Sequence, residues 1–306
     1  NVARLQVLQG RLRAAATTYQ ELVPIAGGLD EVQAIHGGLP YFLGLGELHY
    51  EWNELDQAGE YLAHAIVEGP DMRTTDREYV LLGYLALARL HQARGDLDQA
   101  HHTLLAATDL ARRRGFAAHL VSRVAAAQAQ LSLSAGDLPA AKAWAEKSGL
   151  GVDDMLPFTR EPEYLTLARI WIAQAGQGGQ NILLKQALSL LDRLAADATA
   201  KERGSSVLDL LIVRSQALAA GGDRVAALAT LAQALAFAAP EGYVRRFVDE
   251  VPALWGLLQD IDPSTIAGSP GYVPMLLAAI AAEPGASDRL KPASSPNAGL
   301  IEPLTE

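Results

Sequence analysis

The residues of this chain that could carry out covalent or metal chemistry are not spaced to build a catalytic or metal site. His101 and His102 are adjacent and would point to different faces of a helix, and no two of the seven histidines have the i, i+4 spacing that pairs metal ligands. No candidate serine nucleophile lies in a G-x-S-x-G turn: Ser132, Ser134, Ser205, Ser206 and Ser215. The sequence therefore predicts no enzyme, no metal site and no cofactor in this segment.

Polar and aromatic side chains recur at spacings that suit binding. They follow a small residue (Gly46, Ala88, Ala129 or Ala168) by one and by four or five positions. Such side chains on one surface could hydrogen-bond and stack on a sugar, a peptide or another polar effector. The alternative is a solvated surface with ordinary ion pairs, such as Glu47 to Arg89. The candidates, with Arg123 added from the Ala129 helix, are Glu47, Tyr50, Glu51, Arg89, Gln92, Arg123, Gln130 and Arg169.

The elements that must position these residues form a repeated helical hairpin. An Ala- or Leu-rich helix, a Gly or Asn turn and a second helix recur, with Ala five residues and a bulky apolar residue nine residues beyond the turn, as in "NELDQAGEYLAHA" and "GDLDQAHHTLLAA". Glycine permits the positive φ that ends the first helix, and the following Asp can cap the second. Small residues (Ala58, Ala100, Ala141 and Ala227) are expected where the two helices cross.

This unit resembles the tetratricopeptide repeat, in which a small residue of the first helix meets an Ala of the second. The turns at residues 10, 53, 95, 136, 176 and 222 are about 40 residues apart rather than the usual 34 or so. The resemblance implies an all-α, right-handed superhelical solenoid. Each hairpin would contact mainly its neighbours, and the first helices would line a concave face that carries the candidates above. We expect repeats over 1–240, closing helices over 241–282 and a linker over 283–306.

Composition limits the partners of this chain. The formal net charge of −10 repels nucleic acid, and the best basic run, Arg112 to Arg114, is explained by the C-terminal end of a helix before Gly115. The apolar runs are too short to span a membrane, there is no cysteine, and the opening residues do not form a secretory signal. We expect a cytoplasmic protein, and we expect that the 306-residue chain contacts neither nucleic acid nor membrane.

One phrase beyond the repeats is more specific. Ala239 to Glu250 reads "APEGYVRRFVDE", and the chain ends on "IEPLTE" at Ile301 to Glu306. Similar phrases close the repeat region, and open the DNA-binding domain, of the large LuxR-type transcriptional regulators related to MalT. The chain therefore resembles the middle segment of such a regulator, without the G-x-x-x-x-G-K-[ST] loop of its ATPase module and without its helix-turn-helix domain.

The resemblance implies a function and a set of partners. The repeats would bind an effector and relay it to an upstream ATPase module and a downstream helix-turn-helix domain, and the activated protein would oligomerise. Arg245, Arg246, Asp249 and Glu250 are candidates for contacts between domains, although the sequence favours solvation of the two arginines, or their pairing with Asp249 and Glu250, over an anion site. Two alternatives are a scaffold that captures a protein tail or helix, and an enzyme built on a toroid of helices. No paired carboxylates can be placed for the enzyme.

Overall fold

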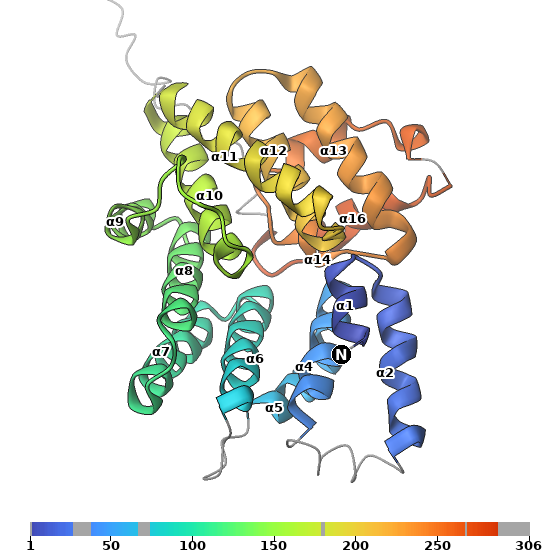
Figure 1. The fold of residues 1–306 in the computed structure, drawn as a ribbon. Helices are drawn as coiled ribbons and strands as arrows, with labels where there is room; N and C mark the ends of the chain where they lie inside the picture. Colours follow the sequence, from blue (N-terminus) through green and yellow to red (C-terminus); the bar gives the residue numbers. More distant parts are fainter. Residues whose placement is uncertain (1, 27–37, 67–73, 179–180, 267, 287–306) are drawn as a thin grey trace, which may run out of the picture.

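The computed structural model describes residues 2–26, 38–66, 74–178, 181–266 and 268–286. Every regular element within these ranges is a helix (Figure 1). Twelve of the helices form six successive pairs: α1 (Val2–Leu8) with α2 (Leu12–Ala26), α4 (Leu39–Glu51) with α5 (Leu55–Ala65), α6 (Thr74–Ala93) with α7 (Leu97–Arg114), α8 (Ala118–Ser134) with α9 (Leu138–Ser148), α10 (Glu161–Gly178) with α11 (Asn181–Ala200), and α12 (Gly204–Ala220) with α13 (Arg224–Ala238). The predicted all-α solenoid of helical hairpins is confirmed.

The turns have the predicted chemistry. Gly95 and Gly222 have φ of 80° and 84°, and Asn53 takes the same left-handed conformation at 64°. The Asp96 side chain accepts a 3.0 Å hydrogen bond from the Gln99 N–H at the start of α7, and Asp137 and Asp223 cap α9 and α13 in the same way. The turn expected at Gly176 is the exception, because α10 continues through it to Gly178.

The small residues lie where helices cross. Ala58, Ala100, Ala141 and Ala227 are fully buried. A Cβ added at Gly46 would lie 2.6 Å from the Leu62 side chain, so α4 and α5 can approach this closely only because residue 46 has no side chain.

The array closes on itself. Besides the contacts between neighbouring hairpins, α1 contacts α12 (Figure 1), and the Ser205 hydroxyl donates a 3.1 Å hydrogen bond to the Leu8 carbonyl. A Cβ added at Gly10 would lie 2.6 Å from the Phe237 ring. The largest hydrophobic cluster accordingly contains residues of the first three hairpins and of the last one. The first and last hairpins therefore meet in a packed interface, which the repeat pattern did not predict.

The segment after the repeats folds back onto the array. It contains the 3-10 helices η3 (Ala239–Glu241) and η4 (Pro263–Thr265) and the short helices α14 (Arg245–Val248), α15 (Trp255–Asp260) and α16 (Tyr272–Ala281). The stretch "PEGYVRRFVDEVPALWGLLQDI" contains the two short helices α14 and α15, separated by Pro252, which has no N–H to donate.

The expected linker begins with packed residues. Glu283 forms an ion pair with Arg245, and Ala286 is buried. The rest of it, residues 287–306 with "IEPLTE", lies outside the described residues. Within the part of the chain that is described, no helix combines the length and the apolar character needed to cross a membrane.

Candidate functional site

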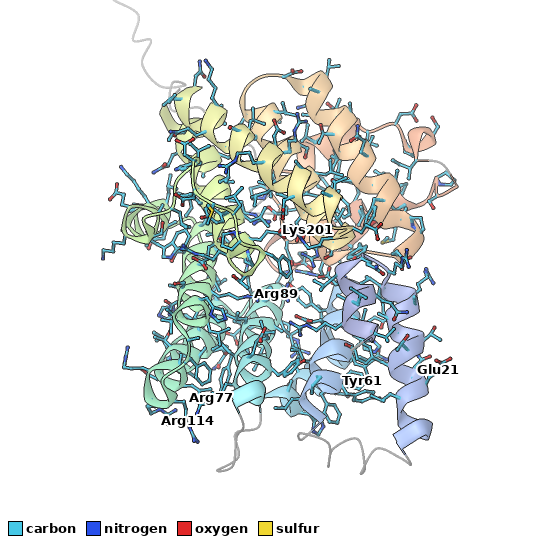
Figure 2. The ribbon with its side chains drawn as sticks, viewed as in Figure 1. Glu21, Tyr61, Arg77, Arg89, Arg114 and Lys201 are labelled. Atoms are coloured by element: carbon cyan, nitrogen blue, oxygen red, sulfur yellow. The ribbon has the colours of Figure 1, made fainter. Side chains whose placement is uncertain are left out.

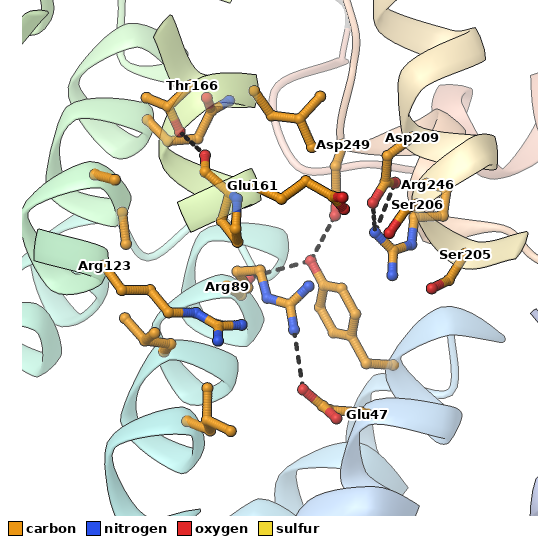
Figure 3. A pocket seen from close by; sticks show the side chains of 18 of the residues that line it. Glu47, Arg89, Arg123, Glu161, Thr166, Ser205, Ser206, Asp209, Arg246 and Asp249 are labelled. Atoms are coloured by element: carbon orange, nitrogen blue, oxygen red, sulfur yellow. Dashed lines mark hydrogen bonds and ion pairs between the residues drawn. The ribbon is translucent and has the colours of Figure 1, made fainter. Parts of the chain in front are cut away.

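A cavity of about 480 Å³ (Figure 3) lies inside the array and is lined by side chains from all six hairpins. Most of its lining side chains come from α1, α4, α6, α8, α10 and α12, the first helices of the six hairpins. Residues 243–250 of the segment that follows α13 complete the wall. This size is typical of small-molecule sites.

All eight candidates chosen from repeat spacing line this one cavity. Figure 2 shows Arg89 near the centre of the molecule, whereas Glu21 and Arg114 lie at its periphery. Of the four candidates for contacts between domains, Arg246, Asp249 and Glu250 also line the cavity. Arg245 does not line it. Its guanidinium is almost fully buried beside the Tyr50 ring, with 5.5 Å between the guanidinium carbon and the ring centroid.

One side of the cavity is lined by arginines whose ion pairs are long. Arg89 lies 3.7 Å from a Glu47 oxygen, and Arg4 lies 4.0 Å from a Glu78 oxygen. Both arginine side chains are more than a third exposed, so water screens these pairs and each contributes little to stability.

Arg123 lies beside these groups without an ion pair. Its side chain is half-buried and points into the cavity near the Arg89 guanidinium (Figure 3). Among the described residues it has neither a hydrogen bond from its guanidinium nor a carboxylate within ion-pair distance. Burial lowers the pKa of Arg123, and the charges of Arg89 and Arg4 lower it further, against the opposing effect of Glu47.

The other side of the cavity is held by short, buried ion pairs. Arg246 donates to both carboxylate oxygens of Asp209 on α12, each at 2.6 Å, and its Nε lies 3.0 Å from an oxygen of Glu51 on α4. Burial raises the pKa of Glu51 although Arg246 and Arg89 act to lower it. Arg246 thus links the second hairpin to the last one across the closure of the array.

Glu250 makes a second link between the segment after α13 and the array. It accepts a 3.0 Å hydrogen bond from Arg169 Nε on α10 and a 2.9 Å hydrogen bond from Gln216 on α12. Burial alone would raise the pKa of Glu250, but the charge and hydrogen bonds of Arg169, together with Gln216, hold it below its usual range.

Asp249 and Arg245 form the third link. The Tyr50 hydroxyl donates a 2.7 Å hydrogen bond to Asp249, and Arg245 donates to the other oxygen of the same carboxylate. Arg245 also donates to Glu283 at 2.7 Å and to the Asn53 side chain at 3.1 Å.

These contacts test the two readings of the arginines in "YVRRF". Arg245 pairs with Asp249, as the i, i+4 spacing predicts, and it is buried. Arg246 does not pair with Glu250, because it faces the cavity and reaches Asp209 and Glu51 on the array.

Sequence reasoning missed several lining residues that the same count would have found. The positions equivalent to Gly46 are Ala3 in the first hairpin and Ser215 in the last, both buried and both seven residues before a turn. The next residues are Arg4, which lines the cavity, and Gln216, which binds Glu250. Glu161 and Asp209 follow no such rule, since they lie near the starts of their helices.

Besides the Tyr243 hydroxyl, two oxygens of side chains that line the cavity have no hydrogen-bond partner among the described residues. They are Glu51 Oε2 and Gln130 Oε1, and both are buried. A buried acceptor without a donor is costly, so these atoms are candidates for contacts with a ligand. No group of three or more potential metal ligands occurs in the described ranges.

A comparison with curated proteins found no match. The model of the family described as the MalT-like TPR region matches residues 1–263, which covers all six hairpins and the segment after them through α15. The chain belongs to the MalT-like TPR region family.

Proposed function

We propose that this chain is the sensor domain of a signal-responsive transcriptional regulator and that it binds a small effector in the cavity between its repeats. One observation carries the proposal: seven side chains chosen from repeat spacing, and Arg123 from the same helix as Ala129, all line a single cavity inside the array. The role is non-catalytic and needs no cofactor bound to this segment.

The geometry favours a small effector over a protein tail, the alternative occupant. The cavity has the volume of a small-molecule site, and α1 contacts α12, so the concave side is not a long open groove. A helix or tail needs an extended surface and would have to displace one end of the array.

The segment 239–250, which we name the closing segment, is suited to pass a binding event on. Arg246, Asp249 and Glu250 line the cavity and pair with α4, α10 and α12, while Arg245 pairs with Glu283 near the end of the described residues. An effector that changes these pairs would therefore change how the C-terminal end of the chain is held.

The remaining parts of the proposal follow from the family resemblance. The relay would reach an ATPase module on one side and a helix-turn-helix domain on the other, in a cytoplasmic regulator of the LuxR type that oligomerises when activated. DNA and ATP would be bound by those domains, and the 306-residue chain itself would contact neither nucleic acid nor membrane.

The test uses a variant that fills the cavity. Ala127 lines it from α8, and Ala106 is exposed on the outer helix α7. A panel of sugars, organic acids and phosphorylated metabolites would be screened by thermal shift against the 306-residue chain. We expect at least one compound to raise the Tm of the wild type and of Ala106→Phe but not of Ala127→Phe.

The relay has its own readout. Binding of the compound should slow hydrogen exchange of the amides in 239–250 of the wild type. The compound should slow the exchange of these amides less in Ala127→Phe. If Ala127→Phe retains binding, the cavity is not the site. If no compound binds while a protein partner is captured by the wild type and lost in Ala127→Phe, the scaffold function replaces the sensor.

A further inference from the structure

We propose that the effector carries an anionic oxygen group, a phosphate or a carboxylate, and that Arg123 and Arg89 bind it. This inference rests on the proposed function and narrows it to a class of ligand. It comes from the unequal way in which the five arginines of the cavity are used: Arg4, Arg89, Arg123, Arg169 and Arg246.

Two of these arginines are committed to the fold. Arg169 and Arg246 bind buried carboxylates through contacts of 2.5 to 3.0 Å, and their side chains are at most a quarter exposed. Breaking such pairs would leave uncompensated buried charges, so these groups are not available to a ligand.

Arg123 is in the opposite situation. Its guanidinium is half-buried, has no hydrogen bond or ion pair among the described residues, and points into the cavity (Figure 3). A guanidinium presents five donors in a fixed fork that matches carboxylate or phosphate oxygens. An arginine left in this state inside a cavity is costly to the free protein, and an anion would remove that cost.

The charges around Arg123 favour an anion rather than a cation. The charged groups that affect it most are Glu47 and Glu78, each already shared with another arginine, and the guanidiniums of Arg89 and Arg4. Together with Arg123 these groups make three cations and two anions, whereas the whole cavity lining has five arginines and seven carboxylates, so an anion is favoured only at the Arg123 side. Arg89 is 43% exposed and 3.7 Å from Glu47, so it can turn to a ligand without losing a strong pair.

The rest of the ligand would meet hydrogen-bond acceptors. Gln130 Oε1 lies on α8, seven residues after Arg123, and Glu51 Oε2 lies on α4, and neither has a donor. A hydroxyl or amino group would satisfy them. The site therefore suits a small metabolite with an anionic group at one end and donors at the other, within a cavity of about 480 Å³.

The experiment uses inorganic phosphate and succinate as probes for the two anionic groups. Their binding to the 306-residue chain would be measured by thermal shift and calorimetry, with sodium chloride keeping the ionic strength constant. We expect one or both to raise the Tm of the wild type. Arg123→Gln should weaken binding by about ten- to a hundredfold, since a charge-assisted hydrogen bond is lost, and Arg123→Lys should weaken it less.

Arg113→Gln is the matched control, because Arg113 is an exposed arginine on the outer helix α7. It should bind the probes like the wild type. Without a probe, the Tm of Arg123→Gln should equal or exceed that of the wild type, since an unpaired and partly buried cation has been removed. A fall in Tm there would mean that Arg123 supports the fold and would overturn the proposal.

Two further results would also overturn it. One is that neither probe binds the wild type, and the other is that a probe binds Arg123→Gln and Arg113→Gln equally, as an adventitious ion only. A neutral sugar that binds the wild type but not Ala127→Phe, while both anions fail, would remove the anionic class and leave the sensor function standing. Glucose and glucose 6-phosphate form a matched pair for that comparison.

Discussion

Tyr50 and Asp249 are 199 residues apart in the chain and are joined by a 2.7 Å hydrogen bond from the phenol to the carboxylate. Tyr50 belongs to the second hairpin, and Asp249 to the closing segment. The bond lies at the edge of the cavity, where Arg89 covers the Tyr50 ring with 5.2 Å between the guanidinium carbon and the ring centroid. It therefore connects the cavity-facing side of the repeats with the segment that follows them.

Tyr50→Phe tests this connection. The ring and its two arginine neighbours stay, while the hydroxyl's hydrogen bonds to the partly exposed Asp249 carboxylate and, at 3.5 Å, to the Arg89 carbonyl are lost, so we expect the free energy of unfolding to fall by about 1–2 kcal/mol. Tyr41→Phe is the control, because the Tyr41 hydroxyl donates no hydrogen bond within the described ranges. Urea unfolding followed by circular dichroism measures both. Equal effects of the two substitutions would show that the Asp249 bond adds nothing.

Arg246→Gln tests the link across the closure. Asp209 and Glu51 would lose their shared cation, and leaving buried carboxylates unpaired costs about 3–5 kcal/mol. Arg112→Gln breaks the exposed pair with Asp109 and should cost less than about 1 kcal/mol. We also expect small-angle scattering to give a larger radius of gyration for Arg246→Gln. An unchanged radius together with an unchanged Tm would contradict the role given to Arg246.

Glu250 predicts a loss of stability in acid. Its pKa is lowered in the fold by Arg169 and Gln216, with Arg246 also contributing, so its stabilisation is present above the unfolded pKa of about 4.3 and disappears as the pH falls through the folded value. The stability gap between wild type and Glu250→Gln should therefore be largest near neutral pH and shrink below about pH 4. Denaturant titrations at several pH values measure it.

Glu51 predicts the opposite slope. Burial raises its pKa, against Arg246 and Arg89, and Asp209 and Asp249 add to the rise. A raised pKa means that the folded state binds the proton more tightly, so the stability of the wild type relative to Glu51→Gln should increase as the pH falls. Parallel pH profiles for the two glutamine variants would show that these carboxylates do not sit in the opposed environments described here.

Gly204→Ala tests the interface between the first and last hairpins. A Cβ there would meet the Gln9 carbonyl oxygen and lie 2.8 Å from the Phe237 ring, so α1 would have to move away from α12. We expect a loss of about 1–3 kcal/mol from this overpacking. Gly176→Ala is the matched control. It lies in α10 with no neighbour within 4 Å of the added Cβ, and it should gain about 0.5–1 kcal/mol. A loss of stability in both variants would mean that close packing at the interface between the first and last hairpins is not the cause of the effect of Gly204→Ala.

Much of the fold could be predicted because each hairpin repeats the same local physics. Glycine at the turn, aspartate at the next N-cap and alanine at the crossing are requirements of a helix pair, and each is visible within a dozen residues. The count that selected Arg89 and Gln130 also depends only on the direction of a helix face. These features need no knowledge of distant residues.

What could not be predicted depends on contacts between the two ends of the chain. No local pattern states that Gly204 packs on Gln9, or that Arg246 pairs with Glu51 and Asp209 rather than with Glu250 one turn away. The i, i+4 rule describes an exposed helix, and α14 is a four-residue helix buried on the side of Arg245. The lack of a partner for Arg123 could not be predicted from the sequence either, since it depends on where four other helices place their carboxylates.

The contact of α1 with α12 gives the array a mechanical property that an open solenoid lacks. An open solenoid changes its curvature gradually, by a small amount at every interface between hairpins. A solenoid whose two ends are in contact can change only when that contact breaks, and the contact of α1 with α12 is not covalent. Its breaking would behave as a transition between two states, and a molecule bound beside the contact would decide which state is occupied.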